Sequence, residues 1–396
     1  MTEDLRPETV LVRAPALVLR LGDADVVKVE IDGETTEVGP VVLKVLDAFA
    51  KPRAMGDVLR ALAAEGPDQF IEASTAVLQL ARIGALGPPG EKRTAKVKGF
   101  VRPAIHLEML DDEARTSGFC RALRHFVGAD DVVVDIGTGT GVLAVGAAHA
   151  GARRVFAVES SGIADLASRV FAANGVGVEL VRGRSTHVTL PEKGTVLVTE
   201  TIGNDPLDET LLEIVRDARA RLLVENARII PSVLELFVFG VDVPEAVFDR
   251  HAASPEHVAR WRAAYGIDLG PLVEHRLAAT QPFAIETEVA RHWPRVTPVT
   301  PLARIDLEGD FETRFEHRVE LPVEADVSRL GVVLAFRATL APGIVVSVLP
   351  DELAPDNCWR WAIRPAFDCL QNARGHKLAV SVAYATGETA LVTRRV

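Results

Sequence analysis

The spacing of apolar and polar residues divides the chain of 396 residues into three parts. Residues 1–88 combine strand-like alternation with helical periodicity, which predicts a small α+β domain. Residues 95–231 alternate apolar runs with helical patterns, which is typical of an α/β domain with a parallel sheet. Residues 232–396 are dominated by segments in which apolar and polar side chains alternate, and this predicts an antiparallel barrel or sandwich.

The N-terminal part, residues 1–88, has two short strand-like segments around a turn at residues 22–25. Helical periodicity follows at residues 38–49 and again at residues 68–86. The second of these predicted helices places four residues on one face: Phe70, Ala73, Val77 and Leu80. A stretch rich in proline, glycine and charge at residues 87–96 predicts a linker that ends the domain. This arrangement resembles the peptide-chaperone domain of the pyrroloquinoline quinone pathway, and a winged-helix-like packing module is the alternative.

Within residues 95–231, the run DVVVDI predicts a strand that leads through a glycine loop into a helix. Further strands are predicted in RRVFAVESS, VGVELVRGR and GTVLVTET. After residue 231, alternating strand patterns recur in VLELFVFGVDV, FETRFEHRVEL, GVVLAFRATL and KLAVSVAYATG. A helical segment at residues 254–276 opens this β-rich part, and Ser254 with Pro255 is a typical helix start.

Composition and charge narrow the classes of function. Apolar residues make up 48% and charged residues 25% of the chain, as in a globular protein with a sizeable core. The net charge is −11 and no lysine/arginine tract is present, so no nucleic-acid partner is expected. An acidic surface instead suits a cationic ligand.

Neither a metal site, nor a membrane span, nor an export signal is expected. Cys120, Cys358 and Cys369 are too few and too scattered for a disulfide framework or a zinc site. The first residues, MTEDLRPETV, lack the basic and apolar regions of a signal peptide. The longest weakly charged stretch, residues 132–151, is broken by Asp135 and by glycines, which argues against a membrane span. We therefore predict a cytoplasmic protein without membrane attachment.

A glycine-rich loop at residues 135–141, with the sequence DIGTGTG, indicates the class of cofactor. It follows a predicted strand and opens a helix, so its glycines let the backbone turn tightly and approach a ligand at the helix N-terminus. A dinucleotide fingerprint would have a third glycine where Val142 stands. Glu159, at the end of the next predicted strand, can accept both ribose hydroxyls of either NAD or S-adenosylmethionine. The D-x-G-x-G-x-G spacing resembles motif I of the class I S-adenosylmethionine methyltransferases, which implies S-adenosylmethionine as the cofactor.

Two glutamates on one short loop, Glu200 and Glu209, suggest what the cofactor acts on. A guanidinium has a pKa above about 12, and its nitrogens are poor nucleophiles while the charge is delocalised. Two carboxylates that grip it offset the charge of a cation placed next to a sulfonium, and they leave one nitrogen with a usable lone pair. Methyl transfer is an in-line displacement that depends mainly on positioning. We therefore predict that Glu200 and Glu209 clamp a guanidinium as the catalytic residues.

The order and spacing of several motifs resemble the protein arginine methyltransferases. The motifs are IHLEMLDDEART, motif I, AGARRVFAVESS, the loop with Glu200, Gly203 and Glu209, and ARIIP. The insert at about residues 243–276 resembles the dimerisation arm of that family, and DNCWRWAI lies where the family has its Thr-His-Trp loop. The resemblance covers about residues 100–396. It implies a Rossmann-like domain over residues 95–231, a β-barrel domain with a helical arm over residues 232–396, and a homodimer.

The resemblance also implies which residues bind the ligands. Arg115 would pair with the methionine carboxylate of the cofactor, and His106 and Met109 belong to the helix that covers it. The implied cofactor-binding residues are His106, Met109, Arg115, Asp135, Gly137, Gly139, Gly141, Glu159 and Ser185. The implied substrate-binding residues are Glu200, Asn204, Glu209, Asn357, Cys358 and Trp359.

The substrate half of the site departs from the family pattern. Where the family has Trp, Met and Tyr between the glutamates, this chain has Thr201, Ile202, Asn204 and Asp205. Phe100 replaces a tyrosine, and Cys358 replaces the histidine of the Thr-His-Trp loop. Without that imidazole, the proton released by the substrate must leave through Glu209, Cys358 or water.

These departures favour free L-arginine or a small analogue as the substrate, in bacterial specialised metabolism that makes natural products. The alternative is an arginine in a peptide or protein whose leader segment is bound by the N-terminal domain. A binding protein with an inactive methyltransferase core is a third hypothesis, and the intact motif I and both glutamates argue against it. Carboxylate O-methylation is disfavoured, because the two glutamates would repel an anionic acceptor at short range.

Overall fold

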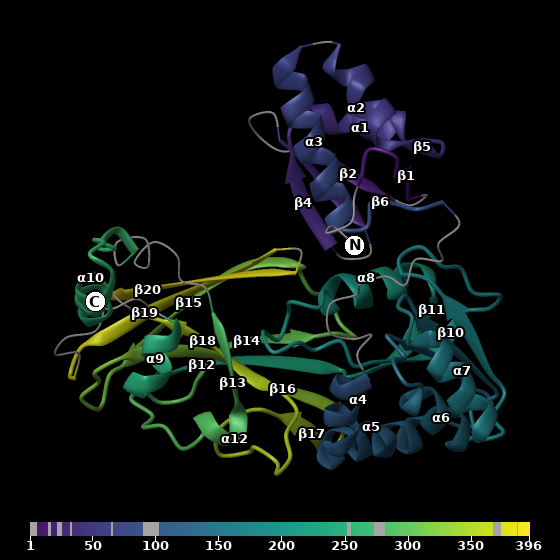
Figure 1. The fold of residues 1–396 in the computed structure, drawn as a ribbon. Helices are drawn as coiled ribbons and strands as arrows, with labels where there is room; N and C mark the ends of the chain where they lie inside the picture. The colour runs from purple at the N-terminus through teal and green to yellow at the C-terminus, as the bar shows by residue number, and fades with distance from the viewer. Residues whose placement is uncertain are drawn as a thin grey trace. The chain divides into compact units, whose positions relative to one another are not determined.

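The computed structural model covers most of the chain (Figure 1). The described residues are 6–14, 17–21, 26–31, 34–64, 66–89, 103–251, 255–272, 282–366, 374–385 and 387–396. The predicted turn at residues 22–25, most of the predicted linker, Phe100, Ser254 and Cys369 lie outside the described residues. The chain divides into two compact units, Met1–Ile105 with Ser161–Ile163 and His106–Ser160 with Ala164–Val396.

The first unit combines small antiparallel sheets with helices. One sheet has the strand order β5–β1–β6 and another has the order β2–β3–β4. The strands are β1 (Val10–Arg13), β2 (Val18–Leu21), β3 (Val27–Ile31), β4 (Glu34–Val38), β5 (Arg53–Ala54) and β6 (Leu86–Gly87). The helices are α1 (Val41–Ala48), α2 (Met55–Ala63) and α3 (Pro67–Arg82). Proline at the first position of α3 fits a helix start, because the N–H it lacks would have no partner there.

Apolar faces of these helices form the core of the first unit. Val45 of α1 and Val77 and Leu80 of α3 are buried, as the helical periodicity predicts. The prediction for Phe70 is wrong, because this residue is 44% exposed. Phe70 lies in the first turn of α3, and the same face of the helix is covered only from Ala73 onward. The resemblance of this unit to a peptide-chaperone domain stays a prediction.

A parallel sheet surrounded by helices forms the first part of the second unit, drawn in blue and teal in Figure 1. Its strand order is β11–β10–β7–β8–β9, and every neighbouring pair is parallel. The strands are β7 (Val132–Ile136), β8 (Arg154–Glu159), β9 (Val178–Arg182), β10 (Gly194–Thr199) and β11 (Leu223–Ile230). The helices are α4 (Pro103–Asp111), α5 (Glu113–Phe126), α6 (Val142–His149), α7 (Ala164–Ala173) and α8 (Leu211–Arg221). The predicted Rossmann-like sheet is confirmed, and β7 is buried along its whole length, as a central strand should be.

The order of the strands brings the candidate site together. β7, β8 and β10 belong to one parallel sheet, so the segments that follow them leave at the same edge. The glycine loop follows β7, Glu159 ends β8, and the loop with Glu200 and Glu209 follows β10.

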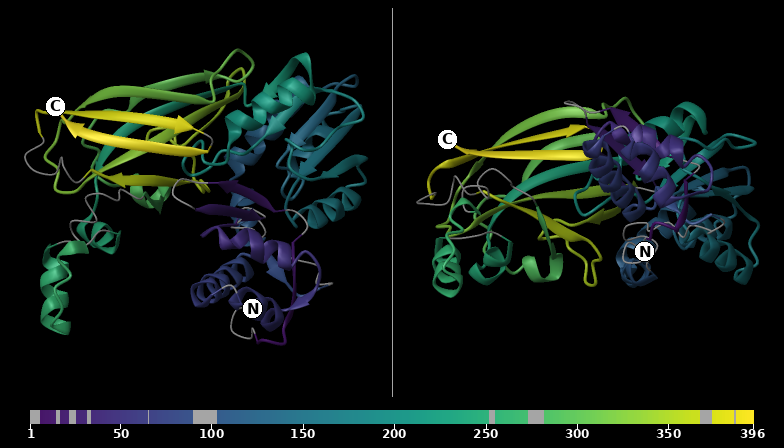
Figure 2. Two further views of the ribbon diagram at one scale, coloured as in Figure 1. Left: turned by 90° about the horizontal axis from the view of Figure 1, so that it is seen from above. Right: turned by 45° about the horizontal axis from the view of Figure 1, so that its top comes forward.

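Antiparallel strands make up the rest of the second unit, in green and yellow in Figure 2. β12 (Val233–Asp242) and β16 (Leu330–Ala341) pair along their lengths within a sheet of order β13–β18–β16–β12–β14, and β17 adds to β16. A further sheet has the order β15–β19–β20. The remaining strands are β13 (Phe283–Glu286), β14 (Thr300–Asp306), β15 (Arg314–Pro322), β17 (Ile344–Ser347), β18 (Arg360–Pro365), β19 (Lys377–Ala385) and β20 (Glu388–Arg395). This part is therefore barrel-like, and its described strands form two sheets.

Helices α9 (Glu245–His251) and α10 (Pro255–Tyr265) occupy the start of the predicted arm, and α12 (Thr287–Ala290) follows β13. In α10 the rings of His257 and Trp261 stack with centroids 5.2 Å apart. Tyr265 at the end of α10, and Ile267 and Leu272 beyond it, are exposed. Exposed apolar side chains of this kind are what a contact surface needs.

One hydrophobic core joins the parallel sheet to the antiparallel strands. It extends from Val133 in β7 to Phe336 in β16 and Trp361 in β18. The fit is close at Gly118 in α5, where a Cβ atom would lie 3.4 Å from the side chain of Leu340. The loops of the candidate site are therefore carried by one packed body. No helix in the described part of the chain is long and apolar enough to cross a membrane.

Gly141 tests how tightly the loop after β7 is packed. Its φ is +87°, and a Cβ atom there would lie 2.4 Å from the ring of Phe171. Gly141→Ala should lower the free energy of unfolding by about 2–4 kcal/mol, because backbone strain and overpacking add. Gly175→Ala is the matched control, since Gly175 also has a positive φ (+64°) but no atom within 4 Å of its Cβ position. Equal losses for the two variants in chemical denaturation would contradict the clash.

Candidate functional site

Left-handed backbone at three glycines shapes the loop between β7 and α6. Gly137, Gly139 and Gly141 have φ values of +75°, +55° and +87°. A Cβ atom at Gly137 would lie 3.0 Å from the side chain of Thr201, and one at Gly139 would lie 3.3 Å from the imidazole of His106. The loop therefore approaches both the double-glutamate loop and α4. Its backbone N–H groups gather at the start of α6, where they can bind polar ligand groups.

Two carboxylates flank the glycine loop. Oε2 of Glu159 accepts a hydrogen bond from the backbone N–H of Gly139 at 3.0 Å. Asp135 is buried at the end of β7, where its Oδ2 accepts from Oγ1 of Thr138 at 2.6 Å. Its Oδ1 has no hydrogen-bond partner among the described residues. Burial raises the pKa of Asp135 to about 7, although the hydrogen bond from Thr138 opposes this rise.

The other residues assigned to the cofactor lie in α4 and after β9. His106 is buried against the glycine loop. Met109 is half-buried, and its backbone oxygen accepts hydrogen bonds from Nη1 of Arg115 at 3.1 Å and from Oγ1 of Thr116 at 3.2 Å. Ser185 is buried, and its backbone oxygen accepts from Arg221 at 2.7 Å.

Arg115 and Glu200 form a buried ion pair. Nη2 of Arg115 donates to Oε2 of Glu200, and the two side chains are only 8% and 6% exposed. The guanidinium lies over the ring of Trp359, with 5.6 Å between Cζ and the ring centroid. Burial acts to lower the pKa of Arg115, but the Glu200 carboxylate raises it, and the net shift is upward. Arg115 therefore stays charged and holds the first glutamate. Its expected contact with the cofactor carboxylate stays a prediction.

Glu209 is half-buried and forms no ion pair with any of the described residues. Burial raises its pKa to about 8, the charges of Glu200 and Asp208 add to the rise, and Arg115 opposes it. Glu200 therefore lies within electrostatic range of Glu209, and the clamp itself stays a prediction. A cation between them would satisfy both carboxylates and favour the ionised form of Glu209.

Trp359 closes the site from the antiparallel part. Its side chain is buried, and Nε1 donates to the backbone oxygen of Ile202 at 2.8 Å. Its backbone N–H donates to Oδ1 of Asn357 at 3.1 Å. Trp359 therefore contacts both Arg115 and the double-glutamate loop, whereas Asn357 orients the segment that carries Trp359.

Cys358 is attached to the start of α5. Its backbone N–H donates to Oδ2 of Asp112 at 3.1 Å, and Oδ1 of Asp112 caps α5 by accepting from the Arg115 N–H at 2.9 Å. Burial raises the pKa of Cys358 to about 12, so its thiol is neutral at physiological pH. Sequence reasoning missed Asp112, although an acid directly before a predicted helix is a capping signal.

Asn204 and Asp205 also find partners inside the protein. Oδ1 of Asn204 accepts from the backbone N–H of Arg360 at 2.7 Å. Asp205 forms a buried ion pair with Arg364 of β18. Both side chains thereby attach the loop to the antiparallel part. Sequence reasoning missed Arg364, and its signal was a lone cation in the otherwise apolar strand segment WAIRPA.

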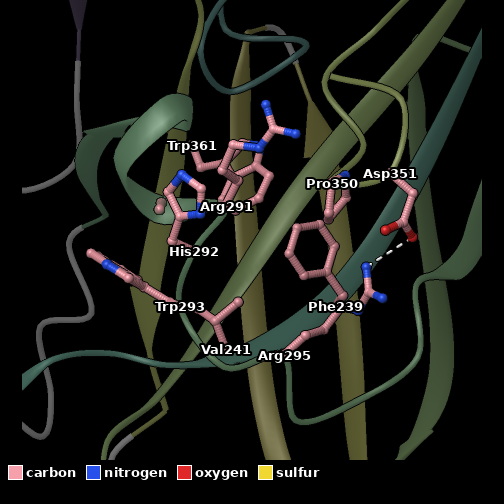
Figure 3. A pocket seen from close by; sticks show the side chains of 10 residues that line it. Phe239, Val241, Arg291, His292, Trp293, Arg295, Pro350, Asp351 and Trp361 are labelled. Carbon is pink, nitrogen blue, oxygen red and sulfur yellow. Dashed lines mark hydrogen bonds and ion pairs between the residues drawn. The ribbon is translucent and has the colours of Figure 1, made fainter. Parts of the chain in front are cut away.

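A pocket of about 400 Å³ lies in the antiparallel part (Figure 3). Its lining residues are Phe239, Val241, Ala290, Arg291, His292, Trp293, Arg295, Pro350, Asp351 and Trp361. Successive side chains of a strand point to opposite faces, so Trp361 faces this pocket while Arg360 and Arg364 face away from it. Arg295 pairs with Asp351 at 2.9 Å, as Figure 3 shows, and Arg291 pairs with Glu288 at 3.1 Å. This pocket is lined by none of the residues of the double-glutamate loop.

Similarity to known sequences covers part of the chain. A sequence profile described as "Ribosomal protein L11 methyltransferase (PrmA)" matches residues 113–232. A probable protein arginine N-methyltransferase 6 of Arabidopsis thaliana is 35% identical over 205 residues, which are 50% of this chain and 46% of that protein. The protein arginine N-methyltransferase PRMT10 of the same plant is 34% identical over 197 residues, which are 46% of this chain and 48% of that protein. This chain spans about half the length of the curated relatives it matches.

Solved structures show the same fold. A Trypanosoma brucei PRMT1 enzyme–prozyme heterotetrameric complex with AdoHcy matches with a TM-score of 0.59 at 22% identity, over 76% of this chain and 100% of that chain. Protein arginine methyltransferase 10 of Arabidopsis thaliana matches with a TM-score of 0.55 at 21% identity, over 75% of this chain and 98% of that chain. The fold is therefore that of the protein arginine methyltransferases, with a Rossmann-like methyltransferase domain and a sheet-rich, barrel-like domain.

Glu209 should make the protein less stable as the pH rises. Its pKa is raised from the ordinary 4.5 to about 8 in the folded protein. Between these values the unfolded chain releases the proton while the folded protein keeps it, so stability is full below pH 4.5, falls through this window and levels off above about 8. Glu209→Gln should flatten the curve of unfolding free energy against pH, by an amount on the order of a few kcal/mol at most.

Denaturant titrations between pH 5 and pH 9 measure this difference. Glu316→Gln, which replaces an exposed glutamate of β15, is the control and should leave the curve unchanged. Asp135, with a pKa of about 7, contributes a fall of the same sign in every variant, so the comparison isolates the share of Glu209. A wild-type slope in Glu209→Gln would show that this carboxyl ionises normally in the folded protein.

Proposed function

We propose that this protein is an S-adenosylmethionine-dependent N-methyltransferase that acts on the guanidinium of arginine. The observation that carries the proposal is the pair Glu200 and Glu209, two neighbouring carboxylates in a site with little access to solvent. Their loop leaves the parallel sheet at the same edge as the glycine loop. The similarity to relatives named protein arginine N-methyltransferases supports the same chemistry for this chain.

The residues around the glycine loop fit S-adenosylmethionine. Positive φ at its glycines leaves room for a ligand beside the backbone, and Glu159 at the end of β8 is placed to accept ribose hydroxyls. His106 would cover the nucleoside side of the loop, and Arg115 would bind the carboxylate of the methionine portion. When bound, this cofactor supplies a methyl group on a positively charged sulfonium.

Glu200 and Glu209 would hold the substrate guanidinium between them. Oε2 of Glu200 is engaged by Arg115, so Oε1 is the oxygen left to accept from the substrate. The arriving cation lowers the pKa of Glu209 and turns it into the second carboxylate of the clamp. Together the two carboxylates draw positive character to one side of the guanidinium and leave a more nucleophilic nitrogen on the other. Trp359 would shield this geometry from water.

The nitrogen that gains the methyl group must lose one proton. Cys358 is a poor acceptor, because a thiol with a pKa of about 12 is protonated at neutral pH. Glu209 is the ionised carboxylate of the clamp once the guanidinium is bound, so it can accept the proton that the methylated nitrogen releases. We assign proton acceptance to Glu209, which passes the proton to water.

Free L-arginine, or a small analogue, is the substrate that we favour. The loop that would read a protein substrate lacks the aromatic residues expected there and carries Thr201, Ile202 and Asn204 instead. A role in natural-product metabolism, and a homodimer formed through the arm, belong to the same proposal. The second candidate is a peptidyl arginine, since the relatives are named for protein substrates. The edge strands of the β2–β3–β4 sheet could also pair with an extended peptide.

The clamp predicts a large loss of turnover in Glu209→Gln. Removing one carboxylate that stabilises developing charge should lower kcat by about 100- to 1,000-fold. The affinity for S-adenosylhomocysteine, measured by calorimetry, should change little, because Glu209 belongs to the substrate side. Glu200→Gln is less clean, since it also leaves Arg115 buried without its partner. Wild-type turnover in Glu209→Gln would end the clamp mechanism.

Mass spectrometry can separate the two substrate classes. The protein should add the mass of one methylene to free L-arginine when incubated with S-adenosylmethionine. A variant lacking residues 1–88 should retain this activity, because the first unit would not take part in binding a free amino acid. If arginine-containing peptides alone are modified, and only when residues 1–88 are present, the peptidyl alternative holds instead.

A further inference from the structure

The loop that carries both glutamates is attached to the antiparallel part through β18. Three donors, two in β18 and one in the residue before it, form hydrogen bonds to the loop. Their acceptors all lie within residues 202–205. The contacts are Trp359 Nε1 to Ile202 O at 2.8 Å, Arg360 N to Asn204 Oδ1 at 2.7 Å, and Arg364 to the Asp205 carboxylate. The position of Glu200 and Glu209 therefore depends on this strand as well as on β10.

The ion pair of Arg364 and Asp205 is one of two contacts shielded from solvent, and the hydrogen bond from Trp359 to Ile202 is the other. The Arg364 and Asp205 side chains are 5% and 12% exposed. Nη1 of Arg364 and Oδ1 of Asp205 are buried and find no hydrogen-bond partner in the described parts of the chain. Such a pair is costly to desolvate, and two apolar residues of similar size often pack as well. Packing alone therefore does not explain why charged residues occupy these positions.

The charges of the loop supply an explanation. Four carboxyl groups lie within ten residues, those of Glu200, Asp205, Asp208 and Glu209. Burial raises the pKa of Asp208 to about 6 and the charge of Asp205 adds to the rise, while Arg364 acts to lower it. The charge of Asp208 in turn raises the pKa of Glu209. Arg364 is thus connected to the second glutamate of the clamp through Asp208.

We propose that Arg364 and Asp205 are positioning residues for the double-glutamate loop: their ion pair fixes the loop on β18 and places the cation of Arg364 beside the carboxyl groups of the loop. This inference rests on the proposed function, because the clamp is what the pair positions. Arg364 acts through its ion pair with Asp205 in the loop and is not proposed to touch the substrate or the cofactor.

Three other titratable groups around the loop do not change charge near neutral pH, whereas Asp135 on β7, with a pKa of about 7, titrates alike in every variant. Arg115 on α5 is held charged by Glu200. Burial keeps the thiol of Cys358 neutral by raising its pKa to about 12. Tyr384 on β19 donates to Oε2 of Glu213 on α8 at 2.6 Å, and burial with this hydrogen bond raises the pKa of the phenol. The pH dependence of the clamp is therefore set by the carboxyls of the loop and by the two arginines that face them.

Opposite shifts in two single variants test the charge of the pair. In Arg364→Gln, the apparent pKa in the profile of kcat/KM against pH should rise by about one unit, so that kcat/KM at pH 7 falls about tenfold. In Asp205→Asn, the same pKa should fall, because one negative charge is removed. The double variant Asp205→Asn with Arg364→Gln removes both charges and should return the pKa toward the wild-type value. A purely structural pair predicts lower activity in both single variants without a shift of the profile, and that result would overturn the inference.

Control variants separate this effect from general destabilisation. Arg337→Gln breaks an ion pair with Glu352 in the same antiparallel part, away from the loop, and should leave the pH profile unchanged. If Arg364→Gln does not fold, the downward shift in Asp205→Asn carries the test, and an upward shift or none in that variant counts against the proposal.

Hydrogen exchange of the free protein gives a readout that needs no turnover. Amides of residues 200–210 should exchange at least tenfold faster in Arg364→Gln than in wild type, and at the wild-type rate in Arg337→Gln. Failure of the wild type to methylate any guanidine would defeat the proposed function but leave this measurement intact. Unchanged protection of residues 200–210 in Arg364→Gln would defeat the positioning role even in an active enzyme.

Discussion

Two carboxylates that share a site with little water cannot both ionise unless a cation is close to them. This constraint governs the arrangement around Glu200 and Glu209. Glu200 is paired with the buried Arg115, whereas Glu209 has no ion-pair partner among the described residues and has a pKa of about 8. The free site is therefore short of one positive charge. A guanidinium supplies that charge in a planar form with several N–H donors, which two carboxylates can bind from two directions.

The fold places Glu209 and the missing positive charge next to the candidate cofactor site. The glycine loop after β7, Glu159 at the end of β8 and the loop after β10 leave one edge of a parallel sheet, so their relative positions follow from the strand order. The antiparallel part then closes the site from the other side through Trp359 and β18. Because one hydrophobic core runs through both parts, this closure is built into a single packed body. The cofactor side is thus fixed by backbone geometry, and the substrate side by side-chain contacts between two sheets.

That division explains how much the sequence could predict. Glycine spacing, the alternation of strands and helices, and an acid at the end of a strand are local features, and the Rossmann-like domain follows from them. The sequence alone did not show which distant segments of the chain are in contact. Asp205 and Arg364 lie 159 residues apart, so nothing in the sequence indicated that they pair. Phe70 fits the period of its helix but lies beyond the end of the core, and periodicity alone cannot show where a core ends. The antiparallel strands were recognised by their alternation, whereas their division into two sheets depends on pairing that alternation does not specify.

Under the proposed function, a neutral thiol at Cys358 changes what selects the substrate. In the proposed reaction the Cys358 thiol is neutral and cannot prepare the acceptor nitrogen. Ionisation of Glu209 then depends on the arriving ligand itself, because only a cation repays the cost of a second buried carboxylate. A neutral amide or an anionic carboxylate would leave Glu209 protonated and the clamp incomplete. Under the proposed function, charge at the loop would therefore select a guanidinium without contacts to the rest of the substrate molecule. Discrimination between a free amino acid and a peptide must consequently come from residues other than Glu200 and Glu209. Thr201, Ile202 and Asn204, which lie between the two glutamates, are candidates.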